Sequence, residues 1–565
     1  MGPANIRTRY YLGPTFVVEH APAAPRVRTT AILLLPPLGY EDTCAYRPLR
    51  VLADELSAAG HVVLRVDWPM LGDGALSGEE ADVIDRCVSA IADAAASLRA
   101  RGFSRVAAVS IRAGGLLALA SGTCDELVLW AVPASGKSYL REERAFHKMA
   151  ARAFGAAPSD RDALPEGAVE AGGFSYSRSA VSALERLVAA DLASASRVTR
   201  ALLIEREGAA PATALVAAFG AAGTAVTTAT LGNLGDLLEN PYQAKIDAAV
   251  AVAVHAWFAE DEGQFQPRSA EATSTLRLAT GVGERPWVER GGAGELSGII
   301  CEPAGGVGPG ARWTLFFNAG GIRRAGPNRL WTRAARALAA RGYPSLRFDV
   351  RDVGDSDGAA TPHADLEAMY SESSIEDGLF AWEWLHGQAA GEIDVVGLCS
   401  GAFLGAQVAA RRNVRRALLF NGLAWVWNDD ARATGVTSHI RGSLFDARRW
   451  RRLLTGRIDA REVARAVVSK ARLTAGGAIA RLTGRAPPDA VAALLGTIAK
   501  RGTDLHLVSS EGDPSIAYLD AHVTPESRPR LTILPGVDHT IRPVWAHGRV
   551  IELIIDAGSP ILERH

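Results

Sequence analysis

Short apolar runs that end at polar or glycine-rich turns recur along both halves of this 565-residue chain. Runs of this length are typical of buried parallel strands, and the longer apolar segments between them have the lengths of helices. Regular alternation of the two predicts an α/β fold in which a mostly parallel sheet is flanked by helices. In the second half the strand-like runs lie at 313–317, 346–349, 393–396, 417–420, 505–510 and 531–534.

The run at 393–396 leads into Gly397-Leu398-Cys399-Ser400-Gly401, which has the form of a strand-to-helix elbow. A glycine on either side of the central residue suits such a strained turn, because a side chain at either flank would clash. The turn would hold the Cys399 sulfur at the top of the sheet and at the positive end of the helix predicted at 402–410, which favours the thiolate. A free cysteine is also a common small core residue, so the pentapeptide alone leaves both interpretations open.

An acid and a histidine follow two later strands. Asp513 comes directly after the run at 505–510, and His539 follows the run at 531–534. The ends of parallel strands are where open α/β sheets build their sites, so we expect Cys399, Asp513 and His539 to meet at one edge of the sheet. The chain order of nucleophile, acid and histidine is the order that an elbow of this type requires.

Residues from about 290 to 560 resemble a complete α/β-hydrolase domain, and the cysteine elbow is similar to those of dienelactone hydrolases and polyhydroxyalkanoate synthases. The resemblance implies Cys399 as nucleophile, His539 as general base and acid, and Asp513 as the orienter of the imidazole. Glu511 and Asp538 are alternative acids. Asp513 is preferred because an Asp-Pro pair is common after that strand, whereas Asp538 would have to fold back onto its neighbour.

The same resemblance implies an oxyanion hole formed by the backbone N–H groups near Gly320 and at Ser400. Gly320 belongs to the small-residue turn after the run at 313–317, where Asn318 stands in place of the histidine of many relatives. We expect Asn318 to contribute to substrate binding together with two indoles that follow another strand end, Trp425 and Trp427.

The first half repeats the second. Its apolar runs match, and Asp67, Gly72 and Asp73 align with Asp349, Gly354 and Asp355. The aligned triad positions hold Arg112, Ala209 and Gly235, and arginine is protonated at any relevant pH and cannot attack an acyl carbon. Ser110 lies two residues too early on its strand to replace it. We therefore expect the N-terminal copy to be a pseudo-enzyme with a structural or recognition role.

These patterns predict two tandem α/β-hydrolase domains, each a mostly parallel sheet flanked by helices with a helical lid insertion, since the chain is too long for one core. The expected boundaries are 1–260 for the degenerate domain, 261–289 for a linker and 290–565 for the catalytic domain. A lid is expected at about 423–500, and it is rich in arginine. Those arginines form either a solvated helical face or a basic mouth for an anionic partner, such as an acyl carrier protein, coenzyme A or an acidic glycan.

Composition narrows the remaining choices. A hydrophobic share of 48% and a formal charge of −1 give no drive toward nucleic acid or a membrane surface. The uncharged stretch 208–235 is rich in Gly, Ala and Thr and is interpreted as domain core, so no membrane span is expected. Prolines interrupt residues 1–28, which therefore lack the apolar core of a secretory signal. Five cysteines without metal-ligand spacing fit a reducing cytoplasm, and no cofactor or metal motif is present.

The sequence therefore predicts an acyltransferase, thioesterase or esterase that works through a Cys399 acyl-thioenzyme. Its substrate would be a small-molecule thioester or ester, in free form or bound to coenzyme A or a carrier protein. The alternative is a non-catalytic scaffold or binding protein built from two α/β-hydrolase domains. In that case Cys399 would be a core residue without a nearby imidazole.

Overall fold

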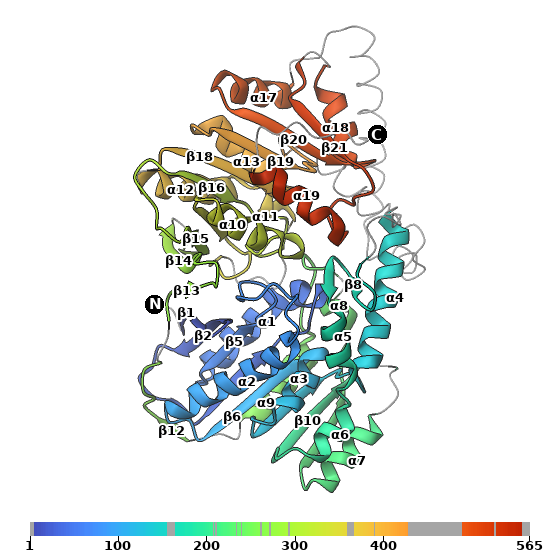
Figure 1. Ribbon diagram of the computed structural model, residues 1–565. Helices are drawn as coiled ribbons and strands as arrows, with labels where there is room; N and C mark the ends of the chain where they lie inside the picture. Colours follow the sequence, from blue (N-terminus) through green and yellow to red (C-terminus); the bar gives the residue numbers. More distant parts are fainter. Residues whose placement is uncertain are drawn as a thin grey trace.

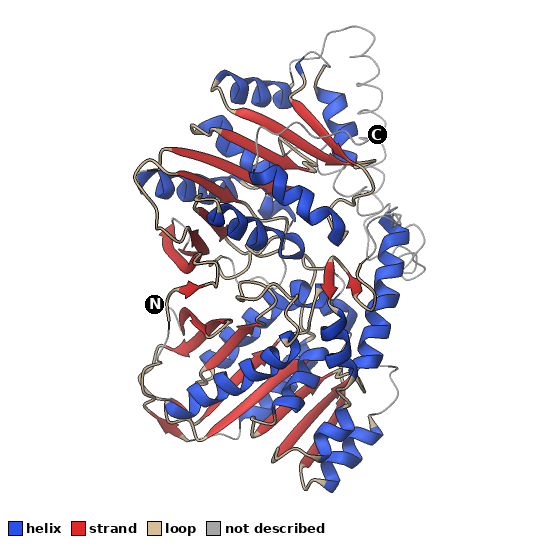
Figure 2. Cartoon of the chain, viewed as in Figure 1, coloured by secondary structure: helices blue, strands red, loops and turns tan. Residues whose placement is uncertain are grey.

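The computed structural model describes residues 5–154, 164–206, 208, 212–232, 234–238, 240–259, 263–270, 273–291, 294–358, 366–388, 390–427, 489–524 and 527–555. Two separate sheets, each flanked by helices, lie one beyond the other (Figures 1 and 2). We refer to the parts of the chain that contain them as the N-terminal half and the C-terminal half. Within the described ranges, no helix combines the length and the apolar character needed to cross a bilayer.

The first sheet has eight strands. β1 and β2 pair antiparallel, β2 pairs antiparallel with β5, and all further pairings are parallel. In spatial order the strands are β1 (Asn5–Leu12), β2 (Thr15–Pro22), β5 (Val63–Asp67), β4 (Thr30–Leu35), β6 (Arg105–Ile111), β7 (Glu126–Trp130), β10 (Arg200–Glu205) and β11 (Ala225–Thr230).

The second sheet repeats this order and adds one strand at its edge. Pairings from β13 to β17 are antiparallel and the others are parallel. In spatial order the strands are β13 (Leu276–Arg277), β14 (Gly283–Gly291), β15 (Gly294–Glu302), β17 (Ser345–Asp349), β16 (Arg312–Phe316), β18 (Glu392–Leu398), β19 (Arg416–Phe420), β20 (Asp504–Ser510) and β21 (Arg530–Leu534). The strands predicted from the apolar runs are confirmed in both halves.

Helices flank both sheets, most of them between consecutive strands and the last ones after the final strand. In the N-terminal half these are α1 (Tyr40–Ala58), α2 (Val83–Ala100), α3 (Ala113–Ser121), α4 (Gly136–Phe154), α5 (Arg178–Glu185), α6 (Ala189–Ser194), α7 (Thr213–Ala221), α8 (Leu234–Leu238) and α9 (Ala248–Ala259). The C-terminal half contains α10 (Leu330–Ala340), α11 (Leu366–Met369), α12 (Glu372–Gly387), α13 (Ser400–Arg411), α17 (Ala490–Lys500), α18 (Pro514–His522) and α19 (Val544–Ile555), with a 3₁₀ turn, η2, at Pro327–Arg329.

The expected linker at 261–289 is not a linker over its whole length. β12 (Gln264–Phe265) pairs with β3 (Val27–Arg28) of the N-terminal half, whereas β13 and β14, which both begin within this segment, belong to the second sheet. The polar residues of this segment concealed short edge strands, which bury few side chains and so leave a weak pattern. Most of the expected lid, residues 428–488, lies outside the described residues. The lid and the role of its arginines therefore stay predictions.

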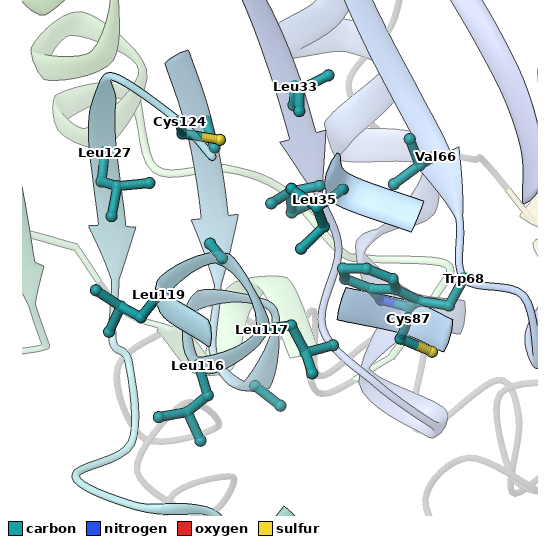
Figure 3. Close-up of a cluster of buried hydrophobic side chains, with 14 of the residues drawn as sticks. Leu33, Leu35, Val66, Trp68, Cys87, Leu116, Leu117, Leu119, Cys124 and Leu127 are labelled. Atoms are coloured by element: carbon teal, nitrogen blue, oxygen red, sulfur yellow. The ribbon is translucent and has the colours of Figure 1, made fainter. Parts of the chain in front are cut away.

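The central strands of both sheets are buried on their two faces, as the apolar runs require. Successive residues of β4 contribute to different clusters, with Leu33 and Leu35 on one face and Ile32 and Leu34 on the other. Figure 3 shows the first of these faces, where leucines of α3 pack under the strands and Trp68 lies beside Cys87. The buried Cys87 and Cys124 are small core residues of this kind.

The two halves meet through a buried charge network with approximate two-fold symmetry. Arg65 of β5 pairs with Asp355 of the C-terminal half, and its counterpart Arg347 of β17 pairs with Asp73 of the N-terminal half at 2.7 Å. Each of these aspartates is held by the preceding turn in the same way. The N–H of Asp73 donates to Asp67 at 2.9 Å, and the N–H of Asp355 donates to Asp349 at 3.1 Å.

Two further arginines strengthen this interface. Arg324 is fully buried and contacts Asp73, Asp349 and Asp355 at 2.8, 2.7 and 2.9 Å, and Arg323 contacts Asp42 and Asp67 of the N-terminal half. Buried charges of one sign are costly unless opposite charges meet them, so this network requires both halves. The charge network brings the turns after β5 and β17 together. The carboxyl ends of these two strands therefore lie near each other.

Candidate active site

Cys399 occupies the turn between β18 and α13. Its φ of 59° and ψ of −114° are uncommon for a residue with a side chain, and its N–H donates to the Phe420 carbonyl at 3.0 Å. A Cβ at Gly397 would collide with the Gly401 carbonyl, and a Cβ at Gly401 would collide with the Asn318 carbonyl. Both flanking glycines are therefore required, as the sequence predicted.

His539 and Asp513 meet at the same edge of the sheet. The Nδ1 atom of His539 lies 2.7 Å from Oδ2 of Asp513, whose other oxygen accepts the Ser515 N–H and caps α18. Asn421, at the end of β19, holds the histidine loop by donating from its side chain to the His539 carbonyl at 2.7 Å. These hydrogen bonds hold the His539 imidazole so that its Nε2 atom faces away from Asp513.

The two alternative acids have other partners. Glu511 accepts a long hydrogen bond from the Gly536 N–H at 3.3 Å in an exposed position. Asp538 is bound by the backbone N–H of Arg542 at 2.7 Å and by its guanidinium at 3.3 Å. The geometry thus joins Asp513, and neither alternative, to His539.

Electrostatics distinguish Cys399 from the other cysteines. Burial raises the pKa of Cys399, but the charge and proximity of the His539 imidazole, together with hydrogen bonds from Tyr370 and the Ser400 N–H, leave its pKa below the usual value. Burial lowers the pKa of His539, and the charges of Cys399 and Asp513 more than reverse this. The two groups therefore favour a thiolate and an imidazolium. No hydrogen bond of ordinary geometry joins His539 Nε2 to a described side chain, so the contact with sulfur is a loose one.

The other four cysteines behave oppositely. Burial raises the pKa of Cys124 to about 12, and it raises the pKa values of Cys44, Cys87 and Cys301 as well. Of the five cysteines, Cys399 alone has a pKa below the usual value, the direction that favours a thiolate.

The two amides expected in an oxyanion hole differ in availability. The N–H of Ser400 interacts with the Cys399 sulfur at the start of α13. The N–H of Gly320, in contrast, donates to the Ser400 hydroxyl at 2.8 Å. The Gly320 amide is therefore already bonded, because the serine that follows the nucleophile carries a side-chain acceptor.

The side chain of Asn318 is hydrogen-bonded within the turn after β16. Its side-chain amide donates to the Ile322 carbonyl and to Asp349, both at 3.0 Å, and its carbonyl oxygen accepts the Val350 N–H at 2.8 Å. All of these bonds brace the turn, and a part for Asn318 in substrate binding stays a prediction. The sequence could not reveal this, because Asp349 and Val350 follow a different strand.

The two predicted indoles have different positions. Trp425 is 2% exposed and packs in the core of the C-terminal half, where its carbonyl accepts a hydrogen bond from Gln407, and a part in substrate binding stays a prediction. Trp427 stacks on the ring of Tyr370 at 4.2 Å between centroids. The Tyr370 hydroxyl lies 3.8 Å from the Cys399 sulfur, which brings Trp427 within one ring of the site.

The equivalent turn of the N-terminal half keeps the shape and lacks the chemistry. Arg112 has φ 54° and ψ −125°, close to the values at Cys399, and it forms ion pairs with Glu41 and Glu142. Ser110 is buried and donates to a carbonyl of the next strand. Gly235 follows the last strand by the same number of positions as His539, whereas Ala209 lies outside the described residues.

No cluster of His, Cys, Asp or Glu side chains in the described ranges has the arrangement of a metal site. No protein-family model matches the chain, and no curated protein sequence is similar to it. Solved structures of α/β hydrolases, however, cover about half of it. One is an α/β serine hydrolase homologue from Coxiella burnetii, with 14% identity over 49% of this chain and 97% of that one and a TM-score of 0.30. A dienelactone hydrolase from Anabaena variabilis has 17% identity over 47% of this chain and 94% of its own, with a TM-score of 0.29. A cold-adapted esterase from an Arctic intertidal metagenomic library has 13% identity over 50% of this chain and 96% of its own, with a TM-score of 0.31.

Proposed function

We propose that the C-terminal half catalyses acyl transfer or hydrolysis through an acyl-thioenzyme on Cys399. The observation that carries the proposal is the arrangement of Cys399, His539 and Asp513 at one sheet edge, with the pKa of the thiol lowered by the neighbouring imidazolium. A cysteine on a strained elbow, paired with an acid-oriented histidine, has the parts that nucleophilic catalysis requires.

In the proposed reaction the Cys399 thiolate attacks the carbonyl carbon of a thioester or ester. A carbon–sulfur bond forms while the carbonyl electron pair moves to oxygen, and the bond to the leaving group then breaks as His539 Nε2 gives that group its proton. Asp513 keeps Nδ1 protonated and stabilises the imidazolium. A second nucleophile, which is water in hydrolysis and an alcohol or amine in transfer, loses its proton to His539 and releases the acyl group from sulfur.

We further propose that the two halves are tandem α/β-hydrolase domains and that the N-terminal one has lost catalysis. Arg112 supports this, since it stands on an elbow of the same backbone conformation as Cys399 and is committed to two carboxylates. A carrier-protein or coenzyme A thioester is one form that the substrate would take. The arginines of the predicted lid, which would attract such an anionic group, lie outside the described residues.

The scaffold alternative predicts a cysteine in an inert environment. Cys124 has such an environment, because it is buried in the core and its pKa is raised to about 12. Cys399 is buried as well, but it differs from Cys124 in its positive φ, its neighbouring imidazole and its lowered pKa. This contrast favours the enzyme over the scaffold.

Turnover of a panel of acyl thioesters and esters tests the proposal. Wild-type protein should release thiol or alcohol from at least one member, and Cys399→Ala should abolish this release. Cys124→Ala is the matched control, since it removes a buried thiol of raised pKa, and it should keep the wild-type rate. Equal turnover by wild type and Cys399→Ala on every accepted substrate would show that the mechanism is wrong and would favour the scaffold.

A further inference from the structure

The N-terminal half extends a tyrosine into the candidate active site of the C-terminal half. Tyr242 lies in the turn between α8 and α9, where its N–H donates to the Asn240 side chain at 2.9 Å. Its ring packs against the hydrophobic core of the C-terminal half. The preceding residue, Pro241, places its carbonyl over Gly321, the neighbour of Gly320. A turn of the first half is therefore seated on the small-residue turn of the second.

The Tyr242 hydroxyl lies between Gly320 and the nucleophile. A Cβ at Gly320, which has a φ of +59°, would overlap with the Tyr242 hydroxyl oxygen, so glycine is required there for both backbone and space. The same hydroxyl is near enough to interact with the Cys399 sulfur. Burial, the Cys399 charge and Tyr40 raise the pKa of Tyr242 well above its ordinary value, so the hydroxyl keeps its proton and acts as a donor.

The Tyr242 hydroxyl lies next to the Gly320 amide, which is not free to act as the second oxyanion donor. The Gly320 amide is bonded to the Ser400 hydroxyl at 2.8 Å, which leaves the Ser400 N–H as the remaining amide of the expected pair. An oxygen attached to a carbon on the Cys399 sulfur would develop its charge next to that sulfur. Tyr242 supplies an O–H at this place.

We propose that Tyr242, contributed by the N-terminal half, is a catalytic residue that donates a hydrogen bond to the oxyanion formed when Cys399 attacks an acyl carbon. The inference rests on the proposed function of Cys399. It gives the degenerate half a direct part in the reaction, because the second oxyanion donor comes from it. When the thiolate adds to the carbonyl, the electron pair that moves to oxygen is stabilised by the Ser400 N–H and the Tyr242 O–H, and it returns when the leaving group departs.

An alkyl trifluoromethyl ketone tests this assignment without requiring turnover. A thiolate adds to such a ketone to give a tetrahedral adduct that keeps the oxyanion, and its affinity depends on the donors around that oxygen. Tyr242→Phe in the full chain should bind the ketone at least about tenfold more weakly and should form the acyl-enzyme about 100-fold more slowly, as loss of one oxyanion donor does elsewhere. Tyr10→Phe removes a hydroxyl that bonds Glu19 within the N-terminal half, and it should leave both values unchanged.

Alkylation by iodoacetamide separates the possible failures. This reaction needs the thiolate and develops no oxyanion, so Tyr242→Phe should keep a rate within about threefold of wild type if its fold is intact. Wild-type affinity for the ketone in Tyr242→Phe, with Cys399 still reactive, would overturn the role of Tyr242 alone. Faster acylation in the variant would also overturn it, because the ring would then be a plug in the acyl site. If wild-type Cys399 formed neither adduct nor alkylated product, the proposed function would fail, and this inference with it.

Discussion

Arg324→Leu should weaken the contact between the two halves by a measurable amount. The guanidinium is fully buried, and its removal takes one partner from each of Asp73, Asp349 and Asp355. Breaking a buried ion pair by removing one partner typically costs 3–5 kcal/mol. Two of these carboxylates keep another arginine, Arg347 for Asp73 and Arg65 for Asp355, so we expect about 3 kcal/mol, the lower end of that range.

Hydrogen exchange measures this effect locally, since a chain of this length need not unfold in two states. The amides of Asp73 and Asp355 are suitable probes, because each donates to a carboxylate of the network. Their protection should fall about 100-fold in Arg324→Leu, which corresponds to the expected free energy. Arg99→Leu is the control, because its pair with Asp125 is exposed, with side chains 40% and 35% accessible, and it should cost at most about 1 kcal/mol. Protection lost equally in both variants, or in neither, would refute the reasoning.

Three further predictions concern charge. The alkylation rate of Cys399 should stay high as pH falls below the ordinary cysteine range and drop only below the lowered thiol pKa; a titration like that of a free thiol would contradict the ion pair. Asp513→Asn should reduce acylation by about 10³-fold or more while ketone binding persists, and an unchanged rate would show that another group orients His539. Burial and the nearby Glu41 raise the pKa of Glu143 to about 8, so its ionisation costs stability as pH rises from about 4.5 toward that value. Glu143→Gln should therefore have a higher midpoint of thermal unfolding than wild type near pH 8, with the difference vanishing below about pH 4; an equal difference at both pH values would contradict the shift.

The sequence predicted those parts of the fold that depend on local pattern. Buried parallel strands must be apolar along their whole length, and an elbow such as that at Cys399 needs glycine at defined spacings, so both leave signals within a few residues. Chain order and strand ends were then sufficient to predict that Asp513 and His539 lie together. Arg112 was recognised in the same way, since the repeat transfers the position of one turn to the other.

Features that depend on distant contacts were missed. Tyr242 gives no local sign of its position, because the site it enters is formed by residues far along the chain. The buried network of Arg324 looks in sequence like a surface charge next to a turn. Asn318 and Trp425 lie at the expected strand ends, but neighbouring strands and helices decide whether such side chains face a site or a core. The short strand β13 was hidden for the related reason that an edge strand buries few residues.

Mass spectrometry of the acyl-enzyme shows which residue of the protein attacks the substrate. Wild-type protein would be incubated with an acyl thioester, quenched in acid, and its intact mass and digested peptides compared with those of Cys399→Ala and His539→Ala. We expect one added acyl group, located on the peptide that contains Cys399 and absent from Cys399→Ala. An acyl group on another residue would contradict the role of Cys399. So would turnover that proceeds without an adduct and persists in Cys399→Ala.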